Sequence, residues 1–351
     1  MLTELQEYAD RAAAALPDVV WDYLQTGSGT EVTAGEAEGA WLRWRLRPRV
    51  LRDGSAVDAR LSLSDLGLHG RSPVLVAPTA FHRMFDSRGE VACAEGARAA
   101  RSVMVVSSRS TSRIEDVAAA AGGPWWFQVY VMRDRSITEA LVRRAADAGA
   151  SALVLTGDTP YIGRKARGGG GRPLPLEDDV AAVNAREHLR PGADLWEAIE
   201  QDGRLSMDDI SWVADLSGLP VLVKGVLRGD DALACLDAGA SGVVVSNHGG
   251  RQLDRAVPTA VALPEVAAAV AGRAPVLADG GIRSGLDAFT ALALGATAVL
   301  VGRPVVWGLA AEGADGVCSV LEALHDHLAH VMGLAGAATL AEVDSSFVTA
   351  A

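Results

Sequence analysis

Cysteine is scarce in this chain of 351 residues, and its three copies show no pattern. Cys93, Cys235 and Cys318 lack the spacing of metal ligands or of paired half-cystines. Each is expected to pack as a small apolar residue, which suits a reducing compartment. The sequence therefore predicts no metal site.

Positive charge is also in short supply, with 32 basic residues against 44 acidic ones and a net charge of −12. A nucleic-acid-binding protein is expected to have a basic patch, so this class is disfavoured. Long apolar runs are missing too. Nothing approaches a membrane span, and residues 1–17 form an amphipathic pattern without the apolar core of a signal peptide. We expect a cytoplasmic protein that binds neither nucleic acid nor membranes.

The chain does contain one pattern repeated eight times: a short β-rich run closed by a small or polar residue, with helical, alanine-rich stretches between the runs. Near-continuous apolar strands that alternate with helices indicate a parallel sheet covered on both faces. Eight such units predict an α/β fold, a (β/α)8 TIM barrel with an N-terminal helical segment. The runs are 73–79, 103–108, 125–131, 152–159, 220–225, 242–250, 275–281 and 297–303.

An open doubly wound sheet is the alternative architecture for the same alternation. Its Gly-x-Gly-x-x-Gly turn after the first strand is absent, which favours the barrel. We expect a single domain over 1–351, with an N-terminal helical extension over 1–65 and the barrel over 66–335.

Every predicted strand becomes polar where it ends, and in such barrels the chemistry lies at the C-terminal ends of the strands. Ser107 or Asp158 alone could be a helix cap. Eight polar ends together indicate an active site at one shared mouth. These residues are Thr79, Ser107, Gln128, Tyr130, Thr156, Asp158, Lys224, Ser246, His248, Asp279 and Arg303.

Two glycine-containing segments with arginines predict an anion site at the same mouth. DGGIRSG (279–285) follows the seventh run and GRP (302–304) follows the eighth. Barrels often hold phosphate in these two loops, at a helix N-terminus. Glycines let backbone N–H groups approach phosphate oxygens, while Arg283 and Arg303 supply charge. Either segment alone fits an ordinary turn; together they predict a phosphate group on a cofactor or a substrate.

Taken together, the motifs resemble those of the FMN-dependent α-hydroxy acid oxidases and dehydrogenases, the family of glycolate oxidase, lactate oxidase and mandelate dehydrogenase. The resemblance runs from residue 20 to about residue 335 in the expected order, and SNHGGRQLD (246–254) is close to diagnostic. It implies FMN as cofactor and oxidation of an (S)-2-hydroxy acid to the 2-oxo acid, with O2 reduced to H2O2. The other matching motifs are APTA, FQVY, DTP, PVLVKGV, DGGIRSG and LVGRPV.

The resemblance also implies roles for the catalytic residues. His248 would be the base that takes the hydroxyl proton, a task that suits histidine near neutral pH. Asp158 would orient its imidazole, and Arg251 would clamp the substrate carboxylate with two parallel bonds. Tyr23 and Tyr130 match tyrosines whose hydroxyls reach the substrate.

A larger set matches the family's flavin contacts. Lys224 matches a lysine near flavin N1 and O2, where a cation stabilises the anionic reduced ring. The remaining matches lie along the ring and around the phosphate. The implied cofactor-binding set is Pro78, Thr79, Ala80, Ser107, Gln128, Thr156, Lys224, Ser246, Asp279, Gly280, Gly281, Arg283, Gly302 and Arg303.

The chain departs from the family after the fourth strand. Lys165 stands where the family has a substrate-binding arginine, and Arg164 precedes it, so either could make this contact. The family's next Arg-Asp-x-Arg-Asn segment is replaced by the four glycines 168–171. The stretch 166–205 is expected to be either an active-site lid loop or a plain surface loop.

A second departure concerns the substrate side chain. Arg109 stands where glycolate oxidase has a bulky tryptophan, and it points either into the site or outward into solvent. If it points inward, the substrate tail is expected to be anionic or aromatic. Phe81 in the neighbouring loop could stack on an aromatic substrate. GSGTE (27–31) and RMF (83–85) resemble 4-hydroxymandelate oxidase, which favours a larger substrate such as a mandelate.

Two other functions remain open. One is a dehydrogenase on the same scaffold with a quinone or a carrier protein as electron acceptor; the polar character of 166–205 favours an oxidase over it. The other is a flavoenzyme of secondary metabolism that acts on an amine or a modified acid, an idea that the altered loop alone supports. Family members are often tetramers, so a homo-oligomer is expected.

Overall fold

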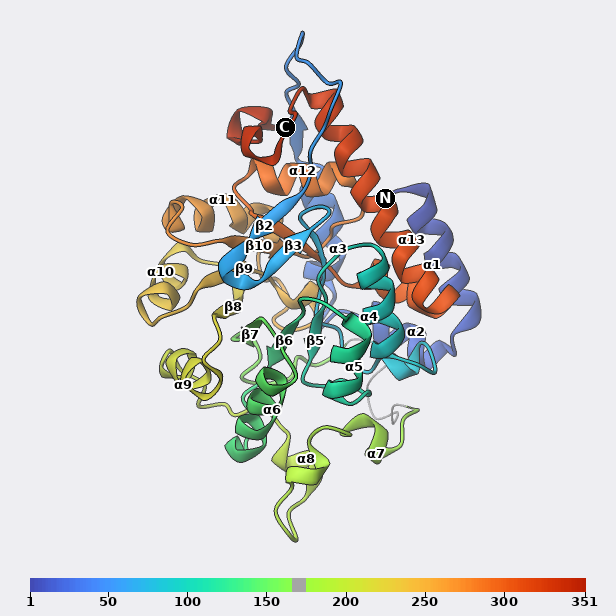
Figure 1. Ribbon diagram of the computed structural model, residues 1–351, viewed down its shortest axis with the longest axis vertical. Coiled ribbons are helices and arrows are strands. Elements are labelled where there is room, and N and C mark those ends of the chain that lie inside the picture. The colour runs from blue at the N-terminus through green and yellow to red at the C-terminus, as the bar shows by residue number, and fades with distance from the viewer. Residues whose placement is uncertain (166–174) are drawn as a thin grey trace.

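The computed structural model describes residues 1–165 and 175–351, and its centre is a parallel barrel (Figure 1). The strand order is β4-β11-β10-β9-β8-β7-β6-β5, and a parallel bridge between Val76 and Met104 joins the two outer strands. Each strand coincides with one predicted run, so the predicted TIM barrel is confirmed. The strands are β4 (Val74–Val76), β5 (Val105–Ser107), β6 (Trp126–Val129), β7 (Ala152–Thr156), β8 (Val221–Val226), β9 (Gly242–Val245), β10 (Val276–Asp279) and β11 (Ala298–Val301).

Helices surround the barrel and follow the strands along the chain (Figure 1). The last of them, α13 (Arg303–Ala335), breaks its helical geometry at Glu312 and Gly313. The others are α4 (Glu90–Ala99), α5 (Ile114–Ala121), α6 (Arg135–Asp147), α9 (Asp208–Ser217), α10 (Gly229–Asp237), α11 (Thr259–Val270) and α12 (Gly285–Ala293).

The barrel is filled with side chains and closed at the N-terminal ends of its strands. Inward-facing residues such as Leu75, Trp126 and Leu277 are fully buried in one apolar cluster. Leu66 and Leu68 join this cluster from the hairpin of β2 (Leu61–Leu63) and β3 (Leu68–Gly70), and Trp126 Nε1 donates to the Leu66 carbonyl over 2.9 Å. A barrel packed in this way can place its site only at the opposite end.

The N-terminal segment contributes one side of that opposite end. It contains α1 (Thr3–Ala15), α2 (Asp18–Gln25) and α3 (Val32–Trp41), followed by β1 (Trp44–Leu46), which pairs with β12 (Val348–Ala350) at the other terminus. A Cβ on Gly250 would lie 2.6 Å from the backbone of Ala34 in α3. Only glycine therefore lets α3 lie directly on the loop after β9, where φ is also positive at +74°.

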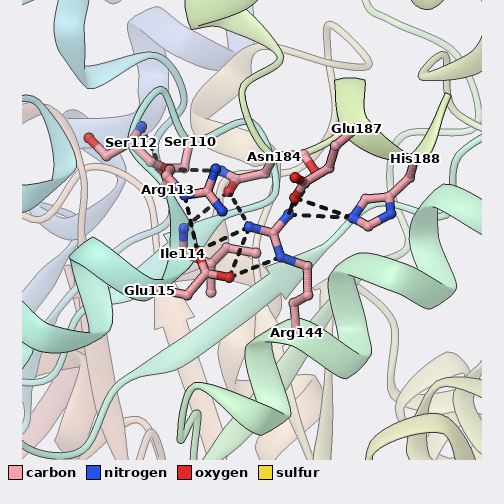
Figure 2. Close-up of polar contacts among 9 residues, drawn as sticks. All are labelled: Ser110, Ser112, Arg113, Ile114, Glu115, Arg144, Asn184, Glu187 and His188. Carbon is pink, nitrogen blue, oxygen red and sulfur yellow. Dashed lines mark hydrogen bonds and ion pairs between the residues drawn. The ribbon is translucent and has the colours of Figure 1, made fainter.

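The segment after β7 is long and is fixed to neighbouring helices. Figure 2 shows Arg144 of α6 pairing with Glu115 of α5 at 2.9 Å and with Glu187 at 2.6 Å, and donating to the Asn184 carbonyl over 3.0 Å. Asn184 in turn accepts a hydrogen bond from the backbone N–H of Ile114. These contacts tie 184–188 to the outside of the barrel. The segment also contains α7 (Asp178–Ala181) and α8 (Leu195–Ala198).

The sequence suggested a lid loop or a surface loop over 166–205. Residues 166–174 of this stretch, with the four glycines 168–171, lie outside the described residues. Among those that are described, no helix has both the length and the apolar character needed to cross a membrane.

Candidate active site

A cavity of about 470 Å³ opens at the C-terminal ends of the barrel strands. Its wall comes from α2, from the loops that follow the strands, and from the segment around α8. Most of the residues singled out from the sequence lie on this wall: Tyr23, Pro78, Thr79, Ala80, Phe81, Ser107, Arg109, Tyr130, Lys165, Lys224, His248, Arg251, Asp279, Gly280, Gly281, Arg283, Gly302 and Arg303.

Four further predicted residues lie behind the wall and hold it. Gln128 accepts a hydrogen bond from Ser107 Oγ over 3.0 Å and donates to Thr156 Oγ1 over 2.9 Å. Ser246 Oγ accepts from Lys224 Nζ over 2.7 Å. Asp158, the fourth, contacts His248.

His248 lies between a carboxylate and a phenol. Its Nδ1 is 3.0 Å from Asp158 Oδ1, and its Nε2 is 3.4 Å from the Tyr130 hydroxyl. Burial alone would raise the pKa of Asp158, but the positive charges of His248 and Lys224 hold that pKa below its ordinary value. Asp158 is therefore ionised, and it fixes Nδ1 as the protonated nitrogen of the ring, leaving Nε2 free to accept a proton.

A glycine in β8 permits this approach. Gly225 has φ +108°, and a Cβ there would lie 2.5 Å from Asp158 Cβ. Any side chain at this position would push the carboxylate away from the imidazole.

Two cations flank the pair. Arg251 donates from Nη1 to the carbonyls of Tyr23 and Thr26 over 2.7 and 3.0 Å, and its guanidinium lies 4.9 Å from the centre of the Tyr23 ring. Lys165 Nζ donates to the Arg251 carbonyl over 2.6 Å. The sequence left open whether Lys165 or Arg164 makes the contact of the family's substrate-binding arginine. Lys165 is on the cavity wall, and Arg164 is exposed. Burial, with Arg251 and Arg303 nearby, lowers the pKa of Lys165 to about 7.

The opposite end of the cavity combines a buried arginine, Arg283, with a partly buried one, Arg303. Arg303 donates to the carbonyls of Leu24 and Gly249, and Arg283 lies 3.0 Å from Glu38 and over the Trp307 ring. Burial, with Arg283 and Arg251 adding repulsion, lowers the pKa of Arg303 to about 9. A bound anion would relieve this repulsion, so the arrangement fits a phosphate.

Lys224 and Asp279 lie between the two ends. Lys224 Nζ is 3.1 Å from Asp279 Oδ2. Burial would lower the pKa of this lysine, but Asp279 and Asp158 raise it above its ordinary value, so the ammonium keeps its charge. Asp279 Oδ1 is buried and accepts no hydrogen bond from any residue that the structure describes.

Comparison with known proteins shows which family has this arrangement of residues. A family model described as FMN-dependent dehydrogenase matches residues 12–350. The chain belongs to this family. It is 40% identical over 351 residues to the peroxisomal (S)-2-hydroxyacid oxidase GLO4 of Arabidopsis thaliana, covering 99% of this chain and 96% of that protein. It is 42% identical over 356 residues to the L-lactate oxidase of Nostoc sp. (strain PCC 7120 / SAG 25.82 / UTEX 2576), covering 98% and 97%.

Solved structures of the family have the same fold. A mandelate oxidase variant with (S)-mandelic acid superposes with a TM-score of 0.90 at 39% identity, covering 100% of this chain and 99% of that one. The family resemblance predicted from the motifs is thus confirmed.

The cofactor of this family is FMN, and the residues present fit it. Arg283 and Arg303, together with the glycines of two loops on the same wall, would hold its phosphate. The unpartnered Oδ1 of Asp279 can accept a hydrogen bond from a ribityl hydroxyl. Lys224 supplies a cation for the electron-rich edge of the flavin ring.

The sequence did not reveal the wall formed by 196–201. Trp196, Ile199, Glu200 and Gln201 all line the cavity, and Arg109 Nη2 donates to the Ile199 carbonyl at the end of α8. These residues follow no family motif and fall in the stretch whose role the sequence left open. Backbone bonds from Asp134 to Ala198 and from Asp202 to Val131 attach this wall to the loop after β6.

Glu90 was also missed. Its side chain is fully buried and accepts four hydrogen bonds: from the backbone N–H groups of His82 and Thr111, and from the hydroxyls of Thr111 and Ser112. The carboxylate thereby joins the loop that carries Phe81 to the loop that carries Arg109. From sequence, an acidic residue at the first position of a helix indicates only a favourable helix end.

Proposed function

We propose that this protein is an FMN-dependent (S)-2-hydroxy-acid oxidase that forms the 2-oxo acid and H2O2. The observation that carries the proposal is the His248–Asp158 pair beside a cavity whose wall includes Arg251 and Lys165 on one side and Arg283 and Arg303 on the other. Its substrate is a 2-hydroxy acid larger than glycolate, such as a mandelate, because Phe81, Arg109 and Trp196 together provide room and contacts for a side chain.

In this proposal the substrate carboxylate binds Arg251 and Lys165, and the phenols of Tyr23 and Tyr130 hold its oxygens. This grip places the α-carbon in one orientation before reaction. Bound FMN would supply the acceptor for the α-hydrogen and its electron pair, with O2 as the final oxidant.

The proton is handled by the chain itself. His248 Nε2 accepts the hydroxyl proton, and Asp158 stabilises the imidazolium that results. Lys224 keeps its charge through Asp279 and compensates negative charge that develops nearby.

The deciding experiment is anaerobic mixing of the FMN-loaded protein with (S)-mandelate, L-lactate and glycolate while flavin absorbance is followed. Bleaching by at least one acid, followed by rapid recovery and H2O2 formation in air, is expected. Bleaching that recovers only with a quinone or carrier would identify a dehydrogenase. Bleaching by an amine or a modified acid, but by none of the three hydroxy acids, would favour the flavoenzyme of secondary metabolism. If none of these compounds bleaches the flavin, the proposal is wrong.

The proposal extends to the state of the protein in the cell: a cytoplasmic homo-oligomer, with a tetramer expected from the family. The scarcity and scattered spacing of cysteine support a reducing compartment. Light scattering after size exclusion measures the oligomer directly.

A further inference from the structure

Arg109 is a cation on the cavity wall that has no acidic partner among the described residues. Within 1–165 and 175–351, its guanidinium makes one hydrogen bond, to the carbonyl of Ile199. Residues 166–174, which the structure does not describe, contain no aspartate or glutamate that could pair with it. The guanidinium is therefore a charged group, partly removed from water, that lacks a compensating anion among the described residues. Burial disfavours such an unpaired charge.

The other cations of the cavity each have an assigned counter-charge. Lys224 pairs with Asp279, and Arg283 pairs with Glu38. In the proposed function Arg303 faces the FMN phosphate, while Arg251 and Lys165 face the substrate carboxylate. Arg109 is the cation that remains.

Arg109 also lies on the side of the cavity that binds the substrate in the proposed function, and not at the phosphate end. Arg109, Tyr23 and Tyr130 line the same cavity, and the positive charge of Arg109 opposes the rise that burial causes in the pKa of both tyrosines. Phe81, whose ring packs 6.2 Å from that of Tyr23, donates its backbone N–H to the Arg109 carbonyl over 3.2 Å. The outward orientation considered from the sequence does not occur.

We propose that the preferred substrates are 2-hydroxy acids with a second anionic group at the far end of the side chain, and that Arg109 binds this group. The inference rests on the proposed function and narrows its substrate class. An aromatic tail could stack on the guanidinium, but it would leave the N–H donors not used by Ile199 without acceptors. A carboxylate accepts two of them in parallel.

The test compares pairs of substrates that share shape and differ in charge, because the carboxylate and the isopropyl group are both branched at one carbon. One pair is (S)-2-hydroxyglutarate and (S)-2-hydroxy-5-methylhexanoate. The other is 4-carboxymandelate and 4-isopropylmandelate. L-Lactate, which has no tail, serves as the reference. Values of kcat/KM are measured for wild type, Arg109→Met and Arg109→Lys, all loaded with FMN.

Wild type is expected to prefer the dianionic member of at least one pair. Arg109→Met should lower kcat/KM for that member roughly ten- to 100-fold more than it lowers kcat/KM for the neutral partner or for lactate. Arg109→Lys should keep part of the preference, since it keeps the charge and loses the planar fork. Inhibition by 2-oxoglutarate should weaken in parallel in the Met variant.

Two results would overturn the inference: a wild type that favours the neutral members of both pairs, or a Met variant that loses both members of a pair equally. The second result would mean that Arg109 only holds the wall through Ile199. If Arg109→Met fails to fold, the preference of wild type within the pairs still decides. Oxidation of lactate without charge discrimination refutes this inference alone, whereas inactivity on every 2-hydroxy acid refutes the proposed function.

Discussion

The two ends of the cavity are built in different ways. The phosphate end uses the loops after β10 and β11, where Arg283 pairs with Glu38 and Arg303 donates to the carbonyls of Leu24 and Gly249. The substrate end uses the loops after β4 to β7, the loop after β9 and the wall at 196–201, and its cations Arg109, Lys165 and Arg251 donate to backbone carbonyls. In the proposed function, Arg303 at the first end is therefore left for the FMN phosphate, and the three cations of the second end are left for the anions of a substrate.

The two departures from the family pattern that the structure describes, Arg109 and Lys165, both lie at the substrate end, whereas the phosphate end keeps the motifs DGGIRSG and LVGRPV. Members of one family bind the same cofactor, so the residues at the strand ends that hold it are expected to vary little. Substrates differ, and long loops can change without disturbing the barrel. The following predictions test whether the two ends are as separable as this comparison implies.

His248→Ala should produce the largest change. It removes the group that accepts the hydroxyl proton, so the rate of flavin reduction by substrate should fall by roughly 10²–10⁴-fold. FMN content should stay at one per chain, because the hydrogen bonds of the His248 side chain to described residues go to Asp158 and Tyr130 and not to Arg283 or Arg303. Stopped-flow reduction and the absorbance of bound flavin measure the two quantities. Loss of FMN together with activity would show that the two ends are not separable.

Replacing Glu90 should be the next largest effect. Glu90→Ala leaves the buried N–H groups of His82 and Thr111 without acceptors, which should lower the free energy of unfolding by about 2–5 kcal/mol. Substrate kcat/KM should fall with it, because the loops of Phe81 and Arg109 separate.

Glu90→Gln is the matched control for that change. Its oxygen can keep the two N–H donors, while its NH2 group faces two hydroxyls that can accept. It should cost only about 1 kcal/mol and should restore the substrate preference of wild type. Denaturant unfolding and kcat/KM on lactate and mandelate check both variants. Equal losses in the two variants would mean that the negative charge, rather than the hydrogen bonding, is what matters.

Arg303→Met should weaken FMN binding by roughly ten- to 100-fold through loss of a charged contact to phosphate. Fluorescence of released flavin gives the Kd. Arg164→Met, at an exposed arginine of the other end, should leave it unchanged. A similar loss in both variants would point to overall charge rather than to a phosphate contact.

The smallest effect concerns pH at the substrate end. Because burial and its cationic neighbours lower the pKa of Lys165 to about 7, its ammonium is lost as pH rises through that value. Carboxylate binding should weaken accordingly. Lys165→Arg stays charged, so the ratio of kcat/KM between wild type and this variant should fall by roughly two- to tenfold from pH 6 to pH 8.5. All other titrating groups are common to both proteins. A constant ratio would show that Lys165 does not titrate in this range.

The sequence predicts the barrel well because its eight strands are buried on both faces and read as continuous apolar runs. The phosphate end is equally readable, since its residues are adjacent to those runs. Prediction fails where a residue acts through distant neighbours. Ile199 reaches the cavity only because 196–201 attaches to the loop after β6, and no local periodicity signals such a contact. Glu90 meets three partners on two other loops, and the pairing appears only once the barrel brings those loops together.

The arginine cluster of Figure 2 bears on how such an enzyme acquires new substrates. Arg144 lies outside the cavity, on α6, yet it holds the segment that continues into the wall at 196–201. Changes at Arg144, Glu115 or Glu187 can therefore shift that wall while leaving every residue of the catalytic centre as it is. Substitutions in this cluster are therefore expected to alter the substrate range from the exterior of the barrel, both in evolution and in a laboratory library.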